Sequence, residues 1–410
     1  RQLYTSLKKV GTHYDVWANN TGLVLVVGAR SAATSVPDQV YRSTDGGTTY
    51  SIATFPPTAY GYLNSIHMID NNTGWAVGSN TSVFKTTNGG ASWDSVPTPF
   101  TEAGKILSKV IFVNANTGWI FSKTSMTGDS TIIKTTNGGT SWFKQKLSTN
   151  TGSSAQIYWA DFVDANTGYC VNYTPRPYKT TDGGDTWTVQ NIVDVFGGFM
   201  YGIDMVDANT GYICGSSGKM YKTTNGGTLW DTLTNRPGWT SPSWYGVKFK
   251  NANIGVFCGT NGMTAITTNG GTSFTLENTS ASTQYNLFLT PLAGYTVGTN
   301  SSIHRNNALP TGTENNLSEV PTQFELAQNY PNPFNPVTTI RFALPKAAVV
   351  TMKVYDILGR EVVRAINNIS YNAGWNSFTF DGSKLSSGVY FYSIIIDNKV
   401  MDTKRMVLVK

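Results

Sequence analysis

The sequence predicts an all-β chain, and two short motifs that recur along its first three quarters carry this prediction. The first motif is a Ser/Thr-Thr-Asp/Asn-Gly-Gly turn with an aromatic residue three positions after the second glycine. Its six copies occupy residues 43–50, 86–93, 135–142, 180–187, 223–230 and 267–274. Their first glycines stand at 46, 89, 138, 183, 226 and 270, a spacing typical of the blades of a β-propeller.

The second motif is a polar turn, usually Asn-Thr-Gly, between two apolar runs. Its seven copies lie at 19–22, 71–75, 114–119, 164–169, 207–212, 251–255 and 292–295. Asparagine and glycine tolerate the positive φ that a tight hairpin needs. Each repeat therefore reads as four strands, with the inner strand before this turn. Seven inner strands predict a seven-bladed propeller over residues 1–306.

The last repeat lacks a clear Gly-Gly turn and ends near 301–305, so its blade needs an outer strand from elsewhere. Residues 2–9 alternate in polarity like a strand. We expect them to pair as the outer strand of blade seven, which closes the ring and leaves no unpaired edge there.

Residues 307–322 are polar, contain two prolines and lack periodicity, which predicts a linker. Residues 323–410 contain alternating segments around a Leu-Gly-Arg turn at 358–360 and a long apolar strand at 389–396. This pattern predicts a small Ig-like antiparallel β-sandwich, preceded by a rigid lead-in around prolines 331, 333 and 336.

Composition narrows the class of protein. Charged residues make up 13% of the chain, aromatic residues 12%, and the net charge of +6 is spread thinly, so nucleic acid is not an expected partner. No apolar run approaches the roughly 20 residues of a membrane span. The sequence begins at Arg1 without a methionine, from which we expect that a signal peptide has been removed. The three histidines have no metal-site spacing, and we expect neither a metal nor a cofactor.

The Gly-Gly motif resembles the Asp box, or BNR repeat, of sialidase-type propellers. Together with the Asn-Thr-Gly turn, it is most similar to the photosystem II assembly and stability factor family. The resemblance implies that the Asp or Asn of each box staples its own turn and has no catalytic part. These residues are Asp45, Asn88, Asn137, Asp182, Asn225 and Asn269.

The C-terminal segment resembles the type A sorting domain of the Bacteroidetes type IX secretion system. The matching stretches are 330–336, 338–345, 354–362, 385–392 and 404–410. The resemblance implies export across the outer membrane by the type IX secretion machinery and a location outside the cell or on its outer surface. It also implies cleavage of this domain, with attachment or release, unless the domain is retained for a structural purpose.

Counting back from the glycine of the second motif suggests which side chains line the channel. The residues seven positions before this glycine in the seven repeats are Asp15, His67, Ile111, Asp161, Asp204, Lys248 and Leu287. Asp161, Asp204 and Lys248 belong to consecutive blades, and neighbouring carboxylates with separated pKa values could serve acid/base hydrolysis. The alternative is an ordinary polar channel lining without catalysis.

Aromatic residues gather near the start of the inner strands of blades four to six. The residues ten positions before the same glycine are Thr12, Asn64, Ser108, Tyr158, Tyr201, Tyr245 and Gln284. Trp159, Trp239 and Trp244 lie nearby in the sequence. Tyr158, Trp159, Tyr201, Trp244 and Tyr245 are the candidate ligand-binding residues, because aromatic platforms stack on sugars or anchor protein partners. The alternative is that these rings pack between blades.

These observations favour a secreted, non-enzymatic scaffold or binding protein with a protein or glycan partner. If the sandwich stays attached, it could dock on a neighbour and build a homo-oligomer or an extracellular filament. The alternative is a glycan hydrolase, or a glycan-binding propeller, that uses Asp161, Asp204 and the aromatic rim. An assembly factor for a membrane complex is a third hypothesis, by analogy alone.

Overall fold

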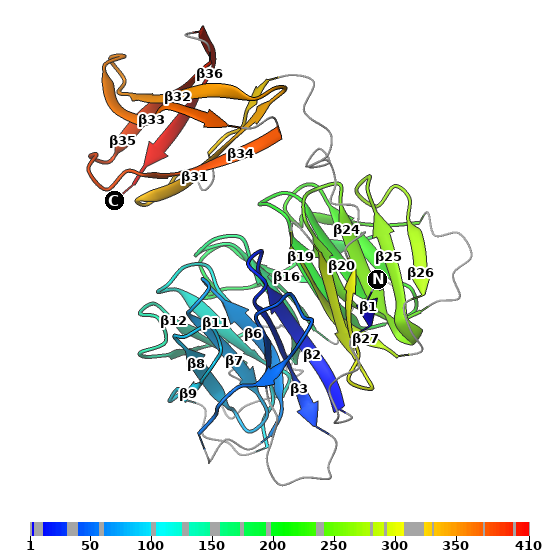
Figure 1. The fold of residues 1–410 in the computed structure, drawn as a ribbon. Coiled ribbons are helices and arrows are strands. Elements are labelled where there is room, and N and C mark those ends of the chain that lie inside the picture. The colour runs from blue at the N-terminus through cyan, green and yellow to red at the C-terminus, as the bar shows by residue number, and fades with distance from the viewer. Residues whose placement is uncertain are drawn as a thin grey trace. The chain divides into compact units, whose positions relative to one another are not determined.

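The computed structural model describes residues 2–3, 11–30, 40–56, 61–99, 104–124, 131–147, 156–172, 176–193, 198–234, 242–278, 282–290, 293–306, 324–329, 332–371, 374–396 and 399–409. The chain forms two compact units, Arg1–Thr311 and Gly312–Lys410. The all-β prediction is confirmed, since the described elements are strands apart from one short 3-10 turn, η1 (Thr260–Gly262) (Figure 1).

Seven sheets make up the first unit in the described residues, and each is one blade of a propeller whose four main strands pair antiparallel. The inner strands are β2 (Gly11–Ala18), β6 (Leu63–Met68), β10 (Leu107–Phe112), β14 (Ile157–Phe162), β19 (Met200–Met205), β23 (Trp244–Phe249) and β27 (Gln284–Leu289). The second strands are β3 (Val24–Arg30), β7 (Gly74–Gly78), β11 (Gly118–Ser122), β15 (Gly168–Asn172), β20 (Gly211–Gly215), β24 (Gly255–Gly259) and β28 (Gly294–Gly298).

The outer half of each blade follows the same order. The third strands are β4 (Val40–Ser43), β8 (Val83–Thr86), β12 (Ile132–Thr135), β16 (Tyr178–Thr180), β21 (Met220–Thr223), β25 (Met263–Thr267) and β29 (Ile303–Asn306). The outer strands of blades one to six are β5 (Ser51–Ile52), β9 (Asp94–Ser95), β13 (Phe143–Gln145), β17 (Thr188–Val189), β22 (Leu229–Thr232) and β26 (Thr275–Asn278). Blade five gains a further strand, β18 (Asn191–Ile192), parallel to β22.

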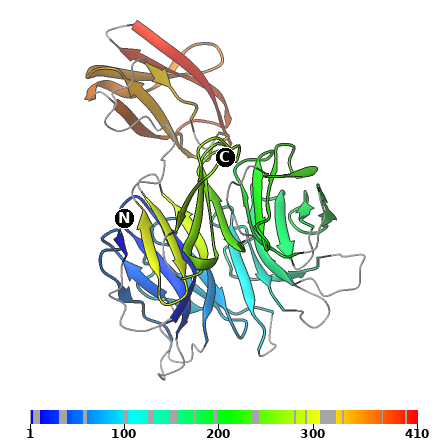
Figure 2. The same ribbon diagram turned by 90° about the vertical axis from the view of Figure 1, so that its right-hand side faces the viewer.

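The inner strands form a closed ring, because each contacts the next and β27 contacts β2. Figure 2 shows the last blade beside the first. The short strand β1 (Gln2–Leu3) pairs with β29, with Gln2 opposite Arg305 and Leu3 opposite His304. The start of the chain is thus the outer strand of blade seven. The rest of the segment 2–9 lies outside the described residues.

Aromatic side chains fill the space between blades. Trp75 on the second strand of blade two stacks on Phe112 of the next inner strand, with ring centroids 3.6 Å apart. Trp119 stacks on Phe162 at 3.8 Å in the same way one blade later. This packing explains why the Asn-Thr-Gly turn is so often followed by a tryptophan or tyrosine, since that position is fully buried against the neighbouring blade.

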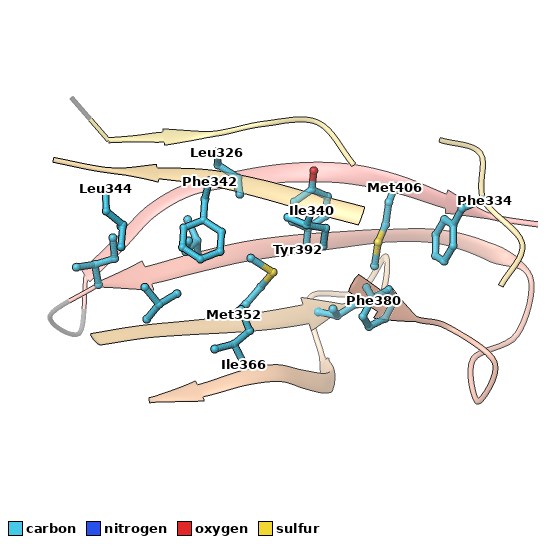
Figure 3. Packing of buried hydrophobic residues seen from close by; sticks show 14 of the residues in the cluster. Leu326, Phe334, Ile340, Phe342, Leu344, Met352, Ile366, Phe380, Tyr392 and Met406 are labelled. Atoms are coloured by element: carbon cyan, nitrogen blue, oxygen red, sulfur yellow. The ribbon is translucent and has the colours of Figure 1, made fainter. Parts of the chain in front are cut away.

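The second unit is a sandwich of two antiparallel sheets over one core. One sheet contains β30 (Glu325–Leu326), β31 (Val337–Leu344) and β34 (Gly374–Asp381). The other contains β33 (Glu361–Tyr371), β32 (Ala348–Tyr355), β35 (Gly388–Ile396) and β36 (Lys399–Leu408). Figure 3 shows the core between them, with Leu344 at one end and Phe334 at the other. The buried Tyr392 hydroxyl donates to the Ala327 carbonyl at 2.9 Å and accepts the Asn329 amide at 2.7 Å.

Candidate binding site

Every inner strand contains a β-bulge near its start. The pairing with the second strand skips one residue in each blade, and a bulge redirects the side chain of the extra residue. The skipped residues are Tyr14, Asn64, Ser108, Tyr158, Tyr201, Tyr245 and Tyr285. Five of these seven equivalent positions therefore carry a tyrosine.

The bulge tyrosines meet in an unbroken series, which we call the tyrosine collar. Ring centroids are 6.0 Å apart for Tyr158–Tyr201, 4.8 Å for Tyr201–Tyr245 and 5.2 Å for Tyr245–Tyr285. Tyr14 continues the series at 5.8 Å from Tyr285. Tyr62 is not a bulge residue but directly precedes β6, and it ends the series at 5.8 Å from Tyr14. The collar thus runs through blades four, five, six, seven, one and two.

All six collar tyrosines are only partly buried, so each keeps some exposed surface. Burial, together with the neighbouring Tyr62 and Tyr285, raises the pKa of Tyr14. The collar lies where the inner strands begin. By the antiparallel order of each blade, this face also carries the connections between blades, whereas the opposite face carries the Asn-Thr-Gly turns and the Asp boxes.

The collar does not close into a full ring, because blade three contributes no tyrosine. There the bulge residue Ser108 is buried and donates to the Ile157 carbonyl at 2.7 Å. Lys123 lies beside this gap, with its ammonium 5.5 Å from the centroid of Tyr158. Burial lowers the pKa of Lys123 to about 8. The gap therefore places a cation at one end of an aromatic arc.

The structure corrects the sequence alignment in blades one and seven. Counting from glycine gave Thr12 and Gln284 as the rim positions, but the bulge residues are Tyr14 and Tyr285. In blade one Gly22 lies inside the turn and Val24 is the first residue of the second strand, whereas in the other blades the glycine itself begins that strand. In blade seven Gly294 does begin the second strand, but the turn before it is one residue shorter, since Leu289 pairs with Gly294 where blade two pairs Met68 with Gly74. Alignment on the first residue of the second strand would therefore have found Tyr14 but not Tyr285.

Two of the predicted aromatic ligands do not belong to the collar. Trp244 is fully buried at 0% exposure inside blade six, where it packs near Phe257, so it cannot contact a partner. Trp159 lines the channel and lies under the Lys109 ammonium, 3.7 Å from its ring centroid. Trp239 lies outside the described residues. The structure does bring Tyr158, Tyr201 and Tyr245 together.

The central channel holds a cavity of about 320 Å³. All seven residues that sequence counting assigned to the channel line it, together with Trp17, Lys109, Trp159 and Asn286. Asp15 and Leu287 are nonetheless at different strand positions from the other five, because the glycine used for counting is offset in blades one and seven. In the described pairing Trp17, not Asp15, is equivalent to His67 and Asp161.

Asp15 is the centre of a buried polar network. Its carboxylate accepts hydrogen bonds from the Ser65 hydroxyl at 2.9 Å and the Ile66 amide at 3.1 Å, and also from the Asn286 amide group. Lys109 reaches it from blade three, with Nζ 3.4 Å from Oδ2. Burial lowers the pKa of Lys109, although Asp15 and Asp161 oppose this effect. The network ties blades one, two, three and seven together across the channel.

The other two carboxylates repeat this blade-to-blade contact. Asp161 accepts the amide of Met205 on the next inner strand at 2.7 Å, and Asp204 accepts the amide of Phe249 at 2.6 Å. Asp204 also pairs with Lys248. Burial raises the pKa of Asp161 to about 6, with Asp204 adding to the effect and Lys248 opposing it. Burial alone would lower the pKa of Lys248, but Asp204 and Asp161 outweigh it and raise that pKa.

Each Asp box binds its own turn. In the third box the Asn137 side chain accepts the Ser141 amide at 2.9 Å and the Thr135 hydroxyl at 3.0 Å. The carbonyl of the following Gly138 accepts Lys85 Nζ of the preceding blade at 3.0 Å. The same side-chain acceptor contacts recur at Asp45, Asn88, Asp182, Asn225 and Asn269. This box thus positions a backbone carbonyl that accepts a hydrogen bond from the neighbouring blade.

Over the described residues no group of three or more His, Cys, Asp or Glu side chains is placed to hold a metal ion. In the same part of the chain no helix has the length and apolar character of a membrane span.

Comparisons with known proteins confirm both resemblances inferred from the motifs. Residues 328–409 match the secretion system C-terminal sorting domain, and residues 56–157 match photosynthesis system II assembly factor YCF48. No curated protein matches the chain.

Solved structures resemble the propeller in fold. YCF48 bound to D1 peptide is 16% identical with a TM-score of 0.58, over 74% of this chain and 94% of that chain. YCF48 from Cyanidioschyzon merolae is 15% identical with a TM-score of 0.57, over 74% and 97%. The WD40 β-propeller domain of Doa1 is 15% identical with a TM-score of 0.57, over 74% and 94%. At these identities the likeness establishes the fold alone.

Proposed function

Because the chain joins a YCF48-like propeller to a C-terminal secretion sorting domain, we propose that it is a non-enzymatic binding protein exported by type IX secretion. It acts outside the cell or on the outer surface. The propeller binds its partner at the tyrosine collar, and the sorting domain is recognised by the secretion machinery.

The continuity of the collar carries this proposal. Six partly buried tyrosines from six blades contact one another in sequence, from Tyr158 to Tyr62. Tyrosine offers a rigid apolar ring with a polar tip, and such residues dominate the binding energy of protein interfaces. A structural relative has been solved with a bound peptide. We therefore assign an extended peptide segment of a partner protein as the ligand.

The hydrogen bonding of the channel supports binding over hydrolysis. Asp15, Asp161 and Asp204 each accept a hydrogen bond from a backbone amide of a neighbouring inner strand. Their carboxylates therefore already link neighbouring blades. One observation favours the second candidate, a glycan hydrolase. The pKa of Asp161 is raised to about 6, a value that suits a general acid near neutral pH.

A peptide display library and a glycan array, screened in parallel with the full chain, would test the proposal. Tyr201→Ala combined with Tyr245→Ala should weaken the affinity for the selected peptide at least about tenfold, because truncation of a hot-spot residue costs about 2 kcal/mol or more of binding free energy. Phe143→Ala is the matched control, since this ring is 44% exposed on the outer strand β13, away from the collar.

Unchanged peptide affinity in the double variant would remove the collar from the proposal. Binding to glycans alone would change the class of partner to carbohydrate. Turnover of a polysaccharide that Asp161→Asn abolishes would support the hydrolase instead.

The proposed function has a second part, which depends on retention of the sandwich. A retained sandwich lets the protein assemble with copies of itself, as a homo-oligomer or a filament. Electron microscopy of the full chain beside a 1–311 truncation tests this part, because particles that assemble only with the sandwich assign it a structural role.

A further inference from the structure

The turn between β32 and β33 presents two neighbouring aliphatic side chains to solvent. Ile357 and Leu358 are each 72% exposed, more than any other large hydrophobic residue in the described part of the chain. Burial of such side chains is favourable, and a rigid pair of them on one tip is a candidate contact. We call Ile357 and Leu358 the knob.

The knob is held by its own turn. The Asp356 carboxylate accepts the amides of Leu358 at 2.9 Å and Arg360 at 3.0 Å. Its other oxygen accepts Arg360 Nε at 2.7 Å, and Gly359 provides the positive φ of 76° that closes the turn. The backbone that carries the two side chains is therefore held in one conformation, which lowers the entropy that a contact would lose.

An apolar cavity lies at the other end of the same strand, and we call it the socket. Its volume is about 260 Å³, larger than the roughly 150 Å³ cavity that accepts a benzene molecule. Its apolar lining consists of Phe324, Leu344, Pro345, Ala348, Ile396 and Met401. Lys346 and Lys399 complete the lining with their side chains. The socket has both the chemistry and the room for one or two aliphatic side chains.

The knob of a molecule cannot reach its own socket. Strand β32 runs from Ala348 at the socket to Tyr355 just before the knob, and its eight residues, each paired with β33 or β35, keep the two apart. At roughly 3.3 Å per residue the separation is about 25 Å. Since knob and socket match in polarity and size but belong to opposite ends of one rigid domain, a second copy of the chain is the occupant that the domain itself supplies.

We propose that the knob of one copy inserts into the socket of the next copy. Such a contact joins two different surfaces, so every addition leaves one free knob and one free socket, and the product is a head-to-tail chain. This inference deepens the self-assembly part of the proposed function and rests on retention of the sandwich. The contact is small, so it requires the high local concentration of a surface or of several linked sites.

Sedimentation velocity of the full chain over a wide concentration range, with electron microscopy, tests the inference. Ile357→Ser with Leu358→Ser removes the knob, and Met401→Glu places a charge in the socket. Met401 is already 40% exposed, so the fold should tolerate the change. Each variant alone should raise the concentration needed for association at least about tenfold. Val337→Ser is the matched control, because this side chain is 43% exposed and belongs to neither feature.

Mixing the two variants gives the sharpest result. The knob variant keeps its socket and the socket variant keeps its knob, so a 1:1 mixture should form dimers that cannot extend. Thermal melting of each variant should match that of the full chain.

Three results would overturn the inference. These are a full chain that stays monomeric at every concentration, knob variants that associate like the unmodified chain, and assembly of the 1–311 truncation. Loss of export in the knob variant, with a monomeric purified chain, would assign the knob to the secretion machinery instead. Peptide binding at the collar, measured on the same variants, separates this failure from failure of the proposed function.

Discussion

The Asp161 carboxylate accepts the backbone amide of Met205 at 2.7 Å, which joins the inner strand of blade four to that of blade five. Asp204 repeats the contact with Phe249 one blade later. A carboxylate at this position replaces a hydrogen bond that a strand edge facing the channel could not otherwise make. The channel acids are thus part of what holds the ring, and changes to them should be read first as changes in stability.

Asp161→Asn should stabilise the propeller near neutral pH. Burial raises the pKa of Asp161 from 3.8 to about 6 in the folded chain, so the native state binds more protons than the unfolded state between these values. Stability from this group is therefore present below about pH 4 and is lost as pH rises through about 6. The amide keeps an acceptor for Met205 and carries no charge. We expect a gain on the order of 1 kcal/mol at pH 7.5.

Urea denaturation of both proteins at pH 5 and pH 7.5 measures this effect. The difference between variant and unmodified chain should be clearly smaller at pH 5, where the loss is only partly developed, than at pH 7.5. Equal differences at the two pH values would contradict a raised pKa at Asp161.

Lys248→Met should destabilise the propeller, because it leaves the buried Asp204 carboxylate without its ion pair. Removing one partner of a buried pair costs about 3–5 kcal/mol. The Lys248 side chain is 37% exposed, so we expect a smaller loss of about 1–3 kcal/mol. Thermal or urea unfolding provides the measurement.

Lys353→Met is the matched control in the sandwich. Lys353 lies 2.8 Å from Glu361 in a partly exposed pair whose carboxylate Arg364 also contacts. Its loss should cost much less than the loss of Lys248, because exposed ion pairs contribute little. If the two substitutions have equal cost, burial does not make the Asp204 pair special.

The repeats made the propeller predictable, because most blades contain both the Gly-Gly turn and the Asn-Thr-Gly turn, whose residues are required by the turn geometry. Gly138, for example, has φ of 67°, and a side chain there would lie 2.9 Å from the Ala115 carbonyl. The sandwich was predictable from alternation and from its sorting-domain motifs. Both predictions rest on local backbone requirements, which a sequence expresses directly.

The candidate site was only half predictable, because it depends on register. Tyr201 and Tyr245 were found by counting, but Tyr14 and Tyr285 were missed, since Gly22 and Gly294 do not stand at the same distance from the bulge. Trp244 illustrates the opposite error. It lies one residue before Tyr245, and the alternation of a strand places it in the blade core.

Asn137→Ala should cost about 1–2 kcal/mol, because it leaves the Ser141 amide and the Thr135 hydroxyl without their acceptor. Asn137→Asp should be nearly neutral, since Asp182 makes the equivalent contact with Thr186 at 2.9 Å. Thermal unfolding compares the two variants. A large loss in the aspartate variant would mean that the Asn137 amide group, which donates to the Ser141 hydroxyl at 2.8 Å, matters more than its oxygen.

Deletion of residues 1–10 should open the ring at blade seven. The deletion removes β1, the strand that pairs with β29 through Gln2 and Leu3, and leaves β29 as an unpaired edge. We expect a lower melting temperature for the deletion variant. We also expect faster amide hydrogen exchange in β28 and β29 than in the second and third strands of the other blades, because edge strands open locally. Deletion of residues 312–410 is the control, since that unit has its own core and its loss should leave the propeller transition in place. Uniform exchange across all seven blades after the N-terminal deletion would show that β1 contributes nothing to closure.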